Sequence, residues 1–185
     1  LALVQIEVLK QLVARGKLRA AIEWVRDFLE TGQKLVLFGT HKEIVHALAD
    51  HFKAPRIMGE TSLPDRDKAV QRFMTDETCR LIVCNIQAGG VGLTLTAASN
   101  VALLERAWAP AAETQAEDRV HRIGQTDSVT AWYLHAPNTI EDRIARLIES
   151  KRLIVDATTE GAAGGNTSIV SDLIRELVGK REEEA

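Results

Sequence analysis

Two arginines and a glutamine in this chain are spaced so that they can bind a polyphosphate together. The segment 115–125 reads Gln-Ala-Glu-Asp-Arg-Val-His-Arg-Ile-Gly-Gln, so Gln115 lies four residues before Arg119 and seven before Arg122. On a helix, these spacings put the three side chains on one face. Two permanent planar cations beside an amide make a good polyphosphate clamp. Gly124 suits the left-handed conformation that ends a helix, which predicts that Arg122 lies at a helix end.

The segment 115–125 resembles motif VI of the Snf2 family of DNA translocases, part of helicase superfamily 2. It matches every fixed position of the pattern Gln-x-x-x-Arg-x-His-Arg-x-Gly-Gln. The resemblance implies that Arg119 and Arg122 are catalytic, and that both bind nucleotide together with Gln115. The alternative is an amphipathic helix whose arginines are solvated. Further motifs in the order that the family requires favour the Snf2 interpretation.

A glycine-rich loop follows the apolar stretch 81–84. Gly89, Gly90 and Gly92 permit backbone conformations closed to other residues and let a phosphate or a DNA strand approach the main chain. Many such loops are mere turns, but this one resembles Snf2 motif V, Ala-Gly-Gly-x-Gly-x-x-Leu-Thr. The resemblance implies that Gly90 and Gly92 bind nucleotide, that Gln87 and Gly89 bind DNA, and that the loop couples the two.

Two threonines admit both a binding role and a structural one. Thr40 and His41 end the first predicted strand and resemble motif IV, which implies DNA contacts for both. A Thr40 hydroxyl there can bond a DNA phosphate, and it can equally cap the following helix. Thr61, in a segment that resembles the family element Gly-x-Thr-x-x-x-x-Arg, is a second DNA-binding candidate. Thr61 or Ser62 can instead cap the helix that starts near residue 64, and capping is the safer interpretation.

Trp108 follows another predicted strand, in the segment Glu105-Arg-Ala-Trp-Ala-Pro110. A tryptophan in such a place is usually buried in a core or an interface. The segment resembles the family pattern Asp-x-x-Trp-Asn-Pro, which implies that Trp108 lies near the DNA minor groove. Glu105 replaces the family's Asp and Ala109 its Asn, so the cap that Asn would give the next helix, worth roughly 1 kcal/mol, is lost.

The chain lacks a Gly-x-x-x-x-Gly-Lys-[Ser/Thr] phosphate loop. Its Asp76-Glu77 pair falls in a polar turn and is rejected as a magnesium site. The resemblance therefore implies half of an ATP site. An absent N-terminal ATPase lobe would complete this site. In the full-length protein the site would bind ATP with Mg²⁺, and the N-terminal lobe would hold the Mg²⁺. The isolated chain is expected to be inactive and to carry no cofactor. The expected partner is double-stranded or branched DNA. Details of the sequence resemble the annealing-helicase, fork-remodelling branch of the family.

Short apolar strands alternate with amphipathic stretches, which predicts an open, doubly wound parallel α/β sheet covered on both faces. The resemblance narrows this to a RecA-like lobe over residues 1–157. Helices are expected at 1–14, 17–30, 43–51, 63–74, 110–122 and 140–157, and strands at 35–38, 56–58, 81–84, 101–104 and 129–135. Residues 158–185 are expected to be a flexible linker, a short amphipathic helix and a charged tail. That helix packs on its own lobe or docks on an absent part of the protein.

The bulk composition is that of an ordinary globular protein. The chain has 185 residues, a net charge of −3 and a pI near 6.0, which argues against a generally basic nucleic-acid coat. Cys79 and Cys84, five apart on a predicted strand, are expected on opposite faces as buried, reduced thiols. His41, His46 and His51 do not share a helical face, and no metal site is predicted.

No apolar run approaches the roughly 20 residues of a membrane span, and no signal peptide is visible. An Ala-rich, Lys-poor composition suggests a bacterial or phage protein in the cytoplasm near the nucleoid, with the nucleus expected if the source is eukaryotic. The chain opens inside a helical pattern and resembles a fragment of a longer protein. A rival interpretation is a non-catalytic DNA- or protein-binding module derived from a helicase lobe. The presence of both arginines favours the motor, because a lobe without hydrolysis needs neither.

Overall fold

Five parallel strands form one sheet in the computed structural model, which describes residues 2–88, 93–107, 110–158, 171–173 and 175. The spatial order is β2-β3-β1-β4-β5, and each of the four pairings is parallel. The three central strands bury every residue, as expected of strands covered on both faces. The strands are β1 (Leu35–Gly39), β2 (Arg56–Ile57), β3 (Leu81–Asn85), β4 (Asn100–Leu103) and β5 (Thr130–Tyr133).

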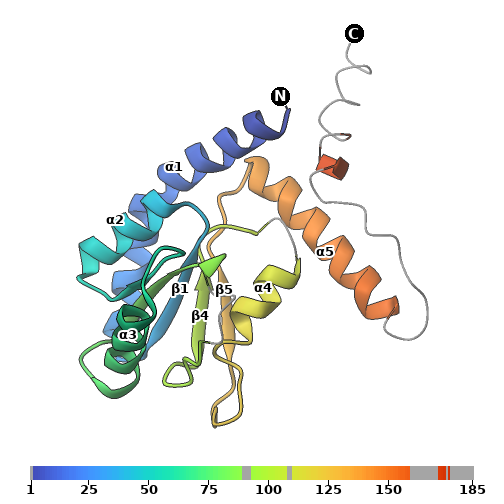
Figure 1. Ribbon diagram of the computed structural model, residues 1–185. Helices are drawn as coiled ribbons and strands as arrows, with labels where there is room; N and C mark the ends of the chain where they lie inside the picture. The colour runs from blue at the N-terminus through green and yellow to red at the C-terminus, as the bar shows by residue number, and fades with distance from the viewer. Residues whose placement is uncertain (1, 89–92, 108–109, 159–170, 174, 176–185) are drawn as a thin grey trace.

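Helices cover both faces of the sheet (Figure 1). They are α1 (Ala2–Glu30), α2 (Lys42–Phe52), α3 (Leu63–Thr75), α4 (Pro110–Glu117) and α5 (Ile140–Thr158). Alternate residues of β1 face opposite ways: Leu35 and Leu37 pack with residues of α1 and α2, whereas Val36 and Phe38 pack with residues of α3 and α4. The predicted doubly wound α/β sheet is confirmed.

Two helix predictions were wrong in their extent. The predicted helices 1–14 and 17–30 are one continuous helix, α1, which passes through Gly16. A glycine inside a helix costs roughly 1 kcal/mol. Burial of Ala14, Ala21 and Val25 in one core cluster offsets that cost. In the other case, α4 ends at Glu117, five residues before the predicted end at Arg122.

A third apolar cluster joins the two ends of the chain. Ile6 of α1 packs with Ile144 and Ile148 of α5 and with Leu173, which is fully buried. At Leu173, therefore, the C-terminal segment packs on its own lobe. The predicted linker and most of the predicted helix 168–179 lie outside the described residues.

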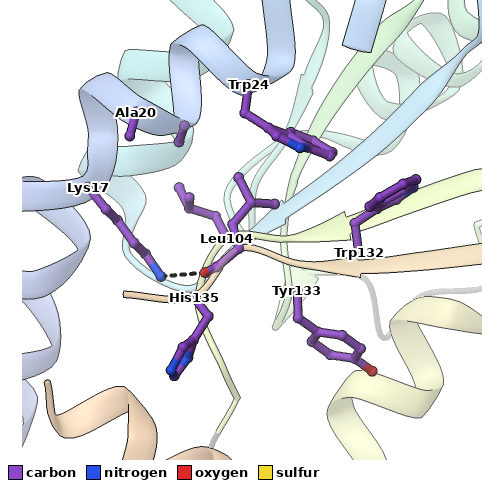
Figure 2. Close-up of a pocket in the computed structure, with 9 residues that line it drawn as sticks. Lys17, Ala20, Trp24, Leu104, Trp132, Tyr133 and His135 are labelled. Atoms are coloured by element: carbon purple, nitrogen blue, oxygen red, sulfur yellow. Dashed lines mark hydrogen bonds between the residues drawn. The ribbon is translucent and has the colours of Figure 1, made fainter. Parts of the chain in front are cut away.

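The outer strand β5 leaves an apolar pocket between itself and α1 (Figure 2). The pocket has a volume of about 330 Å³, and Trp24, Trp132 and Lys17 are among the residues that line it. Trp132 is 39% exposed and packs against Trp24 in a tilted arrangement and against Phe28 edge-on. It donates its Nε1–H to Asn100 Oδ1 at 3.1 Å. None of the predicted site residues that the structure describes lines this pocket.

Candidate functional site

The segments that follow β3, β1 and β4 meet at one edge of the sheet, because neighbouring strands run parallel. Thr40 and His41 come directly after β1, and Gln87 lies two residues after β3 with its side chain exposed. The prediction that Thr40 and His41 lie at the carboxyl edge is confirmed. Four other predicted site residues lie outside the described residues, so their roles stay predictions: Gly89, Gly90, Gly92 and Trp108.

Two buried side chains hold the backbone of Thr40 and His41 in place. Glu105 Oε2 accepts the Thr40 N–H at 2.8 Å and the His41 N–H at 3.0 Å. From the other side, Asn85 Nδ2 donates to the Thr40 carbonyl at 2.7 Å. Asn85 Oδ1 in turn accepts the Gln87 N–H at 3.0 Å. The ends of β3, β1 and β4 are thus joined through one short loop.

The Thr40 hydroxyl does not cap α2. The N-cap residue is His41, and its side chain makes no capping hydrogen bond. Thr40 Oγ1 is buried and has no hydrogen-bond partner among the described residues. An unpaired buried hydroxyl costs roughly 1–3 kcal/mol. Of the two roles that the sequence left open for Thr40, capping was wrong, and the contact to a ligand oxygen stays a prediction.

His41 and Glu105 form a buried ion pair. The His41 Nδ1 contacts Glu105 Oε1, and its Nε2 lies 3.2 Å from Glu7 Oε1 without hydrogen-bond geometry. The hydrogen bond to Glu105 raises the pKa of His41 above its ordinary value. Burial alone would raise the pKa of Glu105, but hydrogen bonds from the His41 ring and from the backbone amides lower it overall. The pair therefore favours imidazolium and carboxylate together.

Around Thr61 the structure favours capping and turn roles. Ser62 is the N-cap of α3, and its hydroxyl accepts the Asp65 N–H. The Thr61 hydroxyl accepts the Met58 N–H at 2.9 Å. Arg66, which sequence reasoning had placed in a family motif, is buried and donates to the carbonyls of Met58, Gly59 and Thr61. Capping of this helix by Thr61 or Ser62 is confirmed for Ser62, and the DNA contact of Thr61 stays a prediction.

The arginine segment lies beyond a helix rather than on one. Because α4 ends at Glu117, Gln115 is on its exposed surface, whereas Arg119 and Arg122 lie in the turns that follow. The predicted single helical face for Gln115, Arg119 and Arg122 was therefore wrong. After Glu117 the chain tightens into turns, because the N–H groups of Arg119 and Val120 bond three residues back, to Ala116 and Glu117. The Arg119 carbonyl accepts the Leu95 N–H at 3.0 Å. Gly124 has a φ of +104°, which fits the predicted left-handed conformation. The prediction that it ends a helix, with Arg122 at the helix end, was wrong, because α4 ends at Glu117.

Arg119 and Arg122 differ in depth. Arg119 is only 4% exposed, and its Nε is buried without a hydrogen-bond partner among the described residues. Burial and the charge of Arg122 lower the pKa of Arg119, yet an arginine stays protonated. Arg122 is exposed and donates to Thr94 Oγ1 at 3.1 Å. The two cations are close enough for the charge of Arg122 to act on Arg119, and one is buried while the other is accessible.

The arginine segment rests on the stretch 94–98, which follows the glycine-rich segment. Gln125 Nε2 donates to the carbonyls of Ala98 at 2.6 Å and Thr96 at 3.4 Å. Together with the bonds of Leu95 and Thr94, these contacts tie the segments that resemble motifs V and VI side by side.

Sequence reasoning missed a buried ion pair at the start of α4. Arg106 donates to both carboxylate oxygens of Glu113, at 2.8 and 3.0 Å, and to Glu149 at 3.1 Å. Its guanidinium lies 4.6 Å from the ring centroid of Tyr133. Glu113 is fully buried and also accepts the Ala107 N–H. The one sequence signal was an acidic residue in the first turn of a helix, which is common.

Two lysines on α1, Lys10 buried and Lys17 partly buried, were also missed. Lys10 donates to the Arg106 carbonyl at 3.0 Å, and Lys17 donates to the Leu134 carbonyl at 2.8 Å and pairs with Glu141. The contact of Lys17 is drawn in Figure 2. Burial lowers the pKa of both lysines. In the sequence they resemble the solvated face of a helix, so only the tertiary structure shows that they join α1 to the ends of β4 and β5.

Other expectations concern thiols, metals and membranes. Cys79 and Cys84 are free and buried as predicted, and burial raises the pKa of Cys84 to about 12. The prediction of opposite faces was wrong, because Cys79 precedes β3 and both pack in one cluster. Within the described ranges, no group of three or more His, Cys, Asp or Glu side chains is placed to hold a metal ion. No described helix is both long and apolar enough to cross a bilayer.

Comparison with known proteins agrees with this architecture. Residues 17–124 match the family described as helicase conserved C-terminal domain. In the solved C-terminal part of the Fun30 ATPase domain, 45% of that chain aligns with 72% of this one, at a TM-score of 0.64 and 27% identity. The five-stranded parallel sheet is thus the RecA-like fold of that structure.

Several longer proteins are similar in sequence. The chain is 38% identical to the SWI/SNF-related matrix-associated actin-dependent regulator of chromatin subfamily A-like protein 1 of Xenopus tropicalis, over 75% of this chain and 15% of that protein. It is 31% identical to the chromatin-remodeling ATPase INO80 of Neurospora crassa, over 81% of this chain and 8% of that protein. It is 33% identical to the human DNA excision repair protein ERCC-6-like, over 78% of this chain and 12% of that protein.

This chain therefore spans only a small part of each of these relatives. The family match covers more than half of the chain, and the fold, the order of the motifs and the relatives all agree. The chain belongs to the helicase conserved C-terminal domain family and is the second, RecA-like lobe of a Snf2-type member of helicase superfamily 2.

Proposed function

We propose that this lobe supplies half of the active site of an ATP-dependent DNA translocase. In this proposal Arg119 and Arg122 reach the phosphates of ATP across a cleft from an N-terminal ATPase lobe of the same protein. They stabilise charge that develops on the transferred phosphoryl group. Gln115, Gly90 and Gly92 complete the nucleotide contacts, and the N-terminal lobe holds the Mg²⁺.

The observation that carries the proposal is the buried Nε of Arg119, which has no partner in the described part of the chain, beside the accessible Arg122. Structural arginines usually satisfy their donors, as Arg66 and Arg106 do in this lobe. A buried cation with a free donor is costly unless an anion completes it. Two guanidiniums at different depths suit a phosphate group, which offers several acceptor oxygens to planar donors.

The DNA side of the proposal rests on the carboxyl edge of the sheet. Thr40, His41 and Gln87 are positioned there, and Thr40 keeps a buried hydroxyl without a partner among the described residues. We infer that these residues, with Thr61, Gly89 and Trp108, contact the backbone of double-stranded or branched DNA. Named relatives are chromatin and DNA-repair proteins of eukaryotes, which supports action on DNA and a nuclear location. They give the expected bacterial or phage source no support.

The test compares the isolated lobe with a full-length protein that carries it. Phosphate release is measured with and without linear duplex and branched DNA. We expect DNA-stimulated hydrolysis from the full-length protein only, because the isolated lobe lacks a phosphate loop. Robust turnover by the isolated lobe would refute the half-site. A full-length protein that binds DNA but never hydrolyses ATP would favour the rival, non-catalytic module.

A further inference from the structure

Two buried polar side chains hold one loop from opposite sides at the carboxyl edge of the sheet. Asn85 is 6% exposed and Glu105 is 2% exposed. Asn85 donates to the Thr40 carbonyl, and Glu105 accepts the N–H groups of Thr40 and His41. Together they satisfy both backbone groups of Thr40, and neither contact belongs to a strand ladder or a helix.

Each of these side chains also connects the loop to a neighbouring segment. The Asn85 amide joins the Thr40 carbonyl to the Gln87 N–H, at the entrance to the glycine-rich segment. Glu105 lies three residues before Trp108 in the sequence and binds the His41 ring as well as the backbone. The loop is therefore cross-linked to the starts of the two other segments to which the proposed function assigns DNA contacts.

We propose that Asn85 and Glu105 are positioning residues that couple DNA binding to ATP hydrolysis, by fixing the Thr40–His41 loop relative to the segments that begin at Gln87 and lead to Trp108. This inference rests on the proposed function. Neither side chain touches DNA or nucleotide. They act by fixing the positions of three contact segments relative to one another, so that DNA binding at one segment affects the positions of the other two.

The variant that isolates Asn85 is Asn85→Asp. The carboxylate keeps an oxygen for the Gln87 N–H, but it cannot donate to the Thr40 carbonyl and repels it instead. Asn100→Asp is the matched control. Asn100 is 5% exposed, lies on the amino end of β4, and also donates through Nδ2 and accepts through Oδ1. Both substitutions place a new charge in a buried site of the same sheet, but only one adjoins the loop.

The variants that isolate Glu105 are Glu105→Ala and Glu105→Gln. Alanine leaves the N–H groups of Thr40 and His41 without their acceptor. Glutamine keeps a carbonyl oxygen for the backbone, and its NH₂ can donate to a neutral His41 ring. A positioning role therefore predicts that glutamine rescues most of what alanine loses. If Asn85→Asp does not fold, this pair carries the test alone.

The experiment measures ATP hydrolysis by the full-length protein at increasing duplex DNA, with melting temperatures of the same preparations. For Asn85→Asp and Glu105→Ala we expect the DNA concentration for half-maximal stimulation to rise about tenfold. The KM for ATP should change less than about twofold, because the nucleotide contacts are intact. Asn100→Asp should lower the melting temperature comparably and leave the DNA concentration unchanged.

Two results overturn the inference alone. One is a half-stimulating DNA concentration that stays within about twofold in Asn85→Asp and Glu105→Ala. The other is an equal rise in Asn100→Asp, which would assign the effect to general destabilisation. If the unmutated full-length protein shows no DNA-stimulated hydrolysis, the proposed function itself fails, and the coupling role fails with it.

Discussion

Arg122 is exposed and hydrogen-bonded to Thr94, whereas Arg119, three residues earlier, is buried and its Nε has no hydrogen-bond partner within the ranges that the structure describes. Arg119→Ala or Arg122→Ala in the full-length protein should lower kcat by about 10³–10⁵-fold and leave ATP binding largely intact. An arginine finger stabilises charge that develops only during transfer, so its loss affects kcat. Lysine should rescue little, because a point charge cannot reproduce the planar fork.

The matched control for the arginine variants is Arg26→Ala, an exposed arginine on α1 away from the proposed site. It should hydrolyse ATP at the unmutated rate. The measurement is steady-state phosphate release at saturating DNA, with nucleotide binding measured separately. If both finger variants lost less than about threefold while Arg26→Ala behaved as expected, the assignment would be refuted.

Sequence patterns predicted the sheet well because its signals are local. Leu35–Phe38 and Leu81–Cys84 are wholly apolar runs, and such runs become central parallel strands when helices cover both faces. The left-handed Gly124 was also predicted from its residue type. In each case the residue type itself sets the local preference.

Much of what the sequence did not predict depends on partners distant in the sequence. The helix predicted to reach Arg122 ends at Glu117, and the turns that follow bond to the distant segment at Leu95. Lys10 and Lys17 resemble solvated residues until the ends of β4 and β5 provide carbonyls for them. Glu105 was noted only as a departure from the family's Asp. Its partners Thr40 and His41 lie in the loop after β1, more than sixty residues away in the sequence.

Stability should depend strongly on the buried pair of Arg106 and Glu113. Removal of either partner alone, as in Arg106→Ala or Glu113→Ala, leaves an uncompensated buried charge and should cost about 3–5 kcal/mol of unfolding free energy. The double variant Arg106→Met, Glu113→Leu should recover much of that loss, since it removes both charges and keeps the volume. Urea unfolding of the lobe measures all three. Additive losses in the double variant would contradict a coupled pair.

The pair of His41 and Glu105 should make stability depend on pH. The folded-state pKa of His41 is raised, so its contribution is fully present below its unfolded pKa of about 6.5 and is lost as the pH rises through the folded value. The pKa of Glu105 is lowered, so its contribution is present above about pH 4.3 and is lost as the pH falls through the folded value. The pair therefore contributes most between about pH 4.3 and 6.5.

Melting temperatures of the unmutated lobe and of Glu105→Gln test this window. The gap between the two proteins should be larger at about pH 5.5 than at about pH 8.5, because only the unmutated protein gains from a charged His41. Glu7 and Lys10, which also act on His41, and the surface pair of His135 and Asp142 are common to both proteins and cancel in the comparison. A gap that does not change with pH would show that the ion pair adds no stability.

The Thr40→Val variant should show whether the Thr40 hydroxyl binds a ligand or stabilises the fold. Valine has nearly the shape of threonine, and Thr40 Oγ1 has no hydrogen-bond partner in the described part of the chain. The melting temperature should therefore stay the same or rise. If the hydroxyl binds a DNA phosphate, the variant should need about tenfold more DNA for half-maximal stimulation, as expected for a lost hydrogen bond to a charged group.

Thr139→Val is the contrasting control, because the Thr139 hydroxyl donates to the Ala136 carbonyl and accepts the Glu141 N–H. It should lower stability and leave the DNA response unchanged. A destabilised Thr40→Val with an unchanged DNA response would mean that the hydroxyl serves the fold and not the ligand.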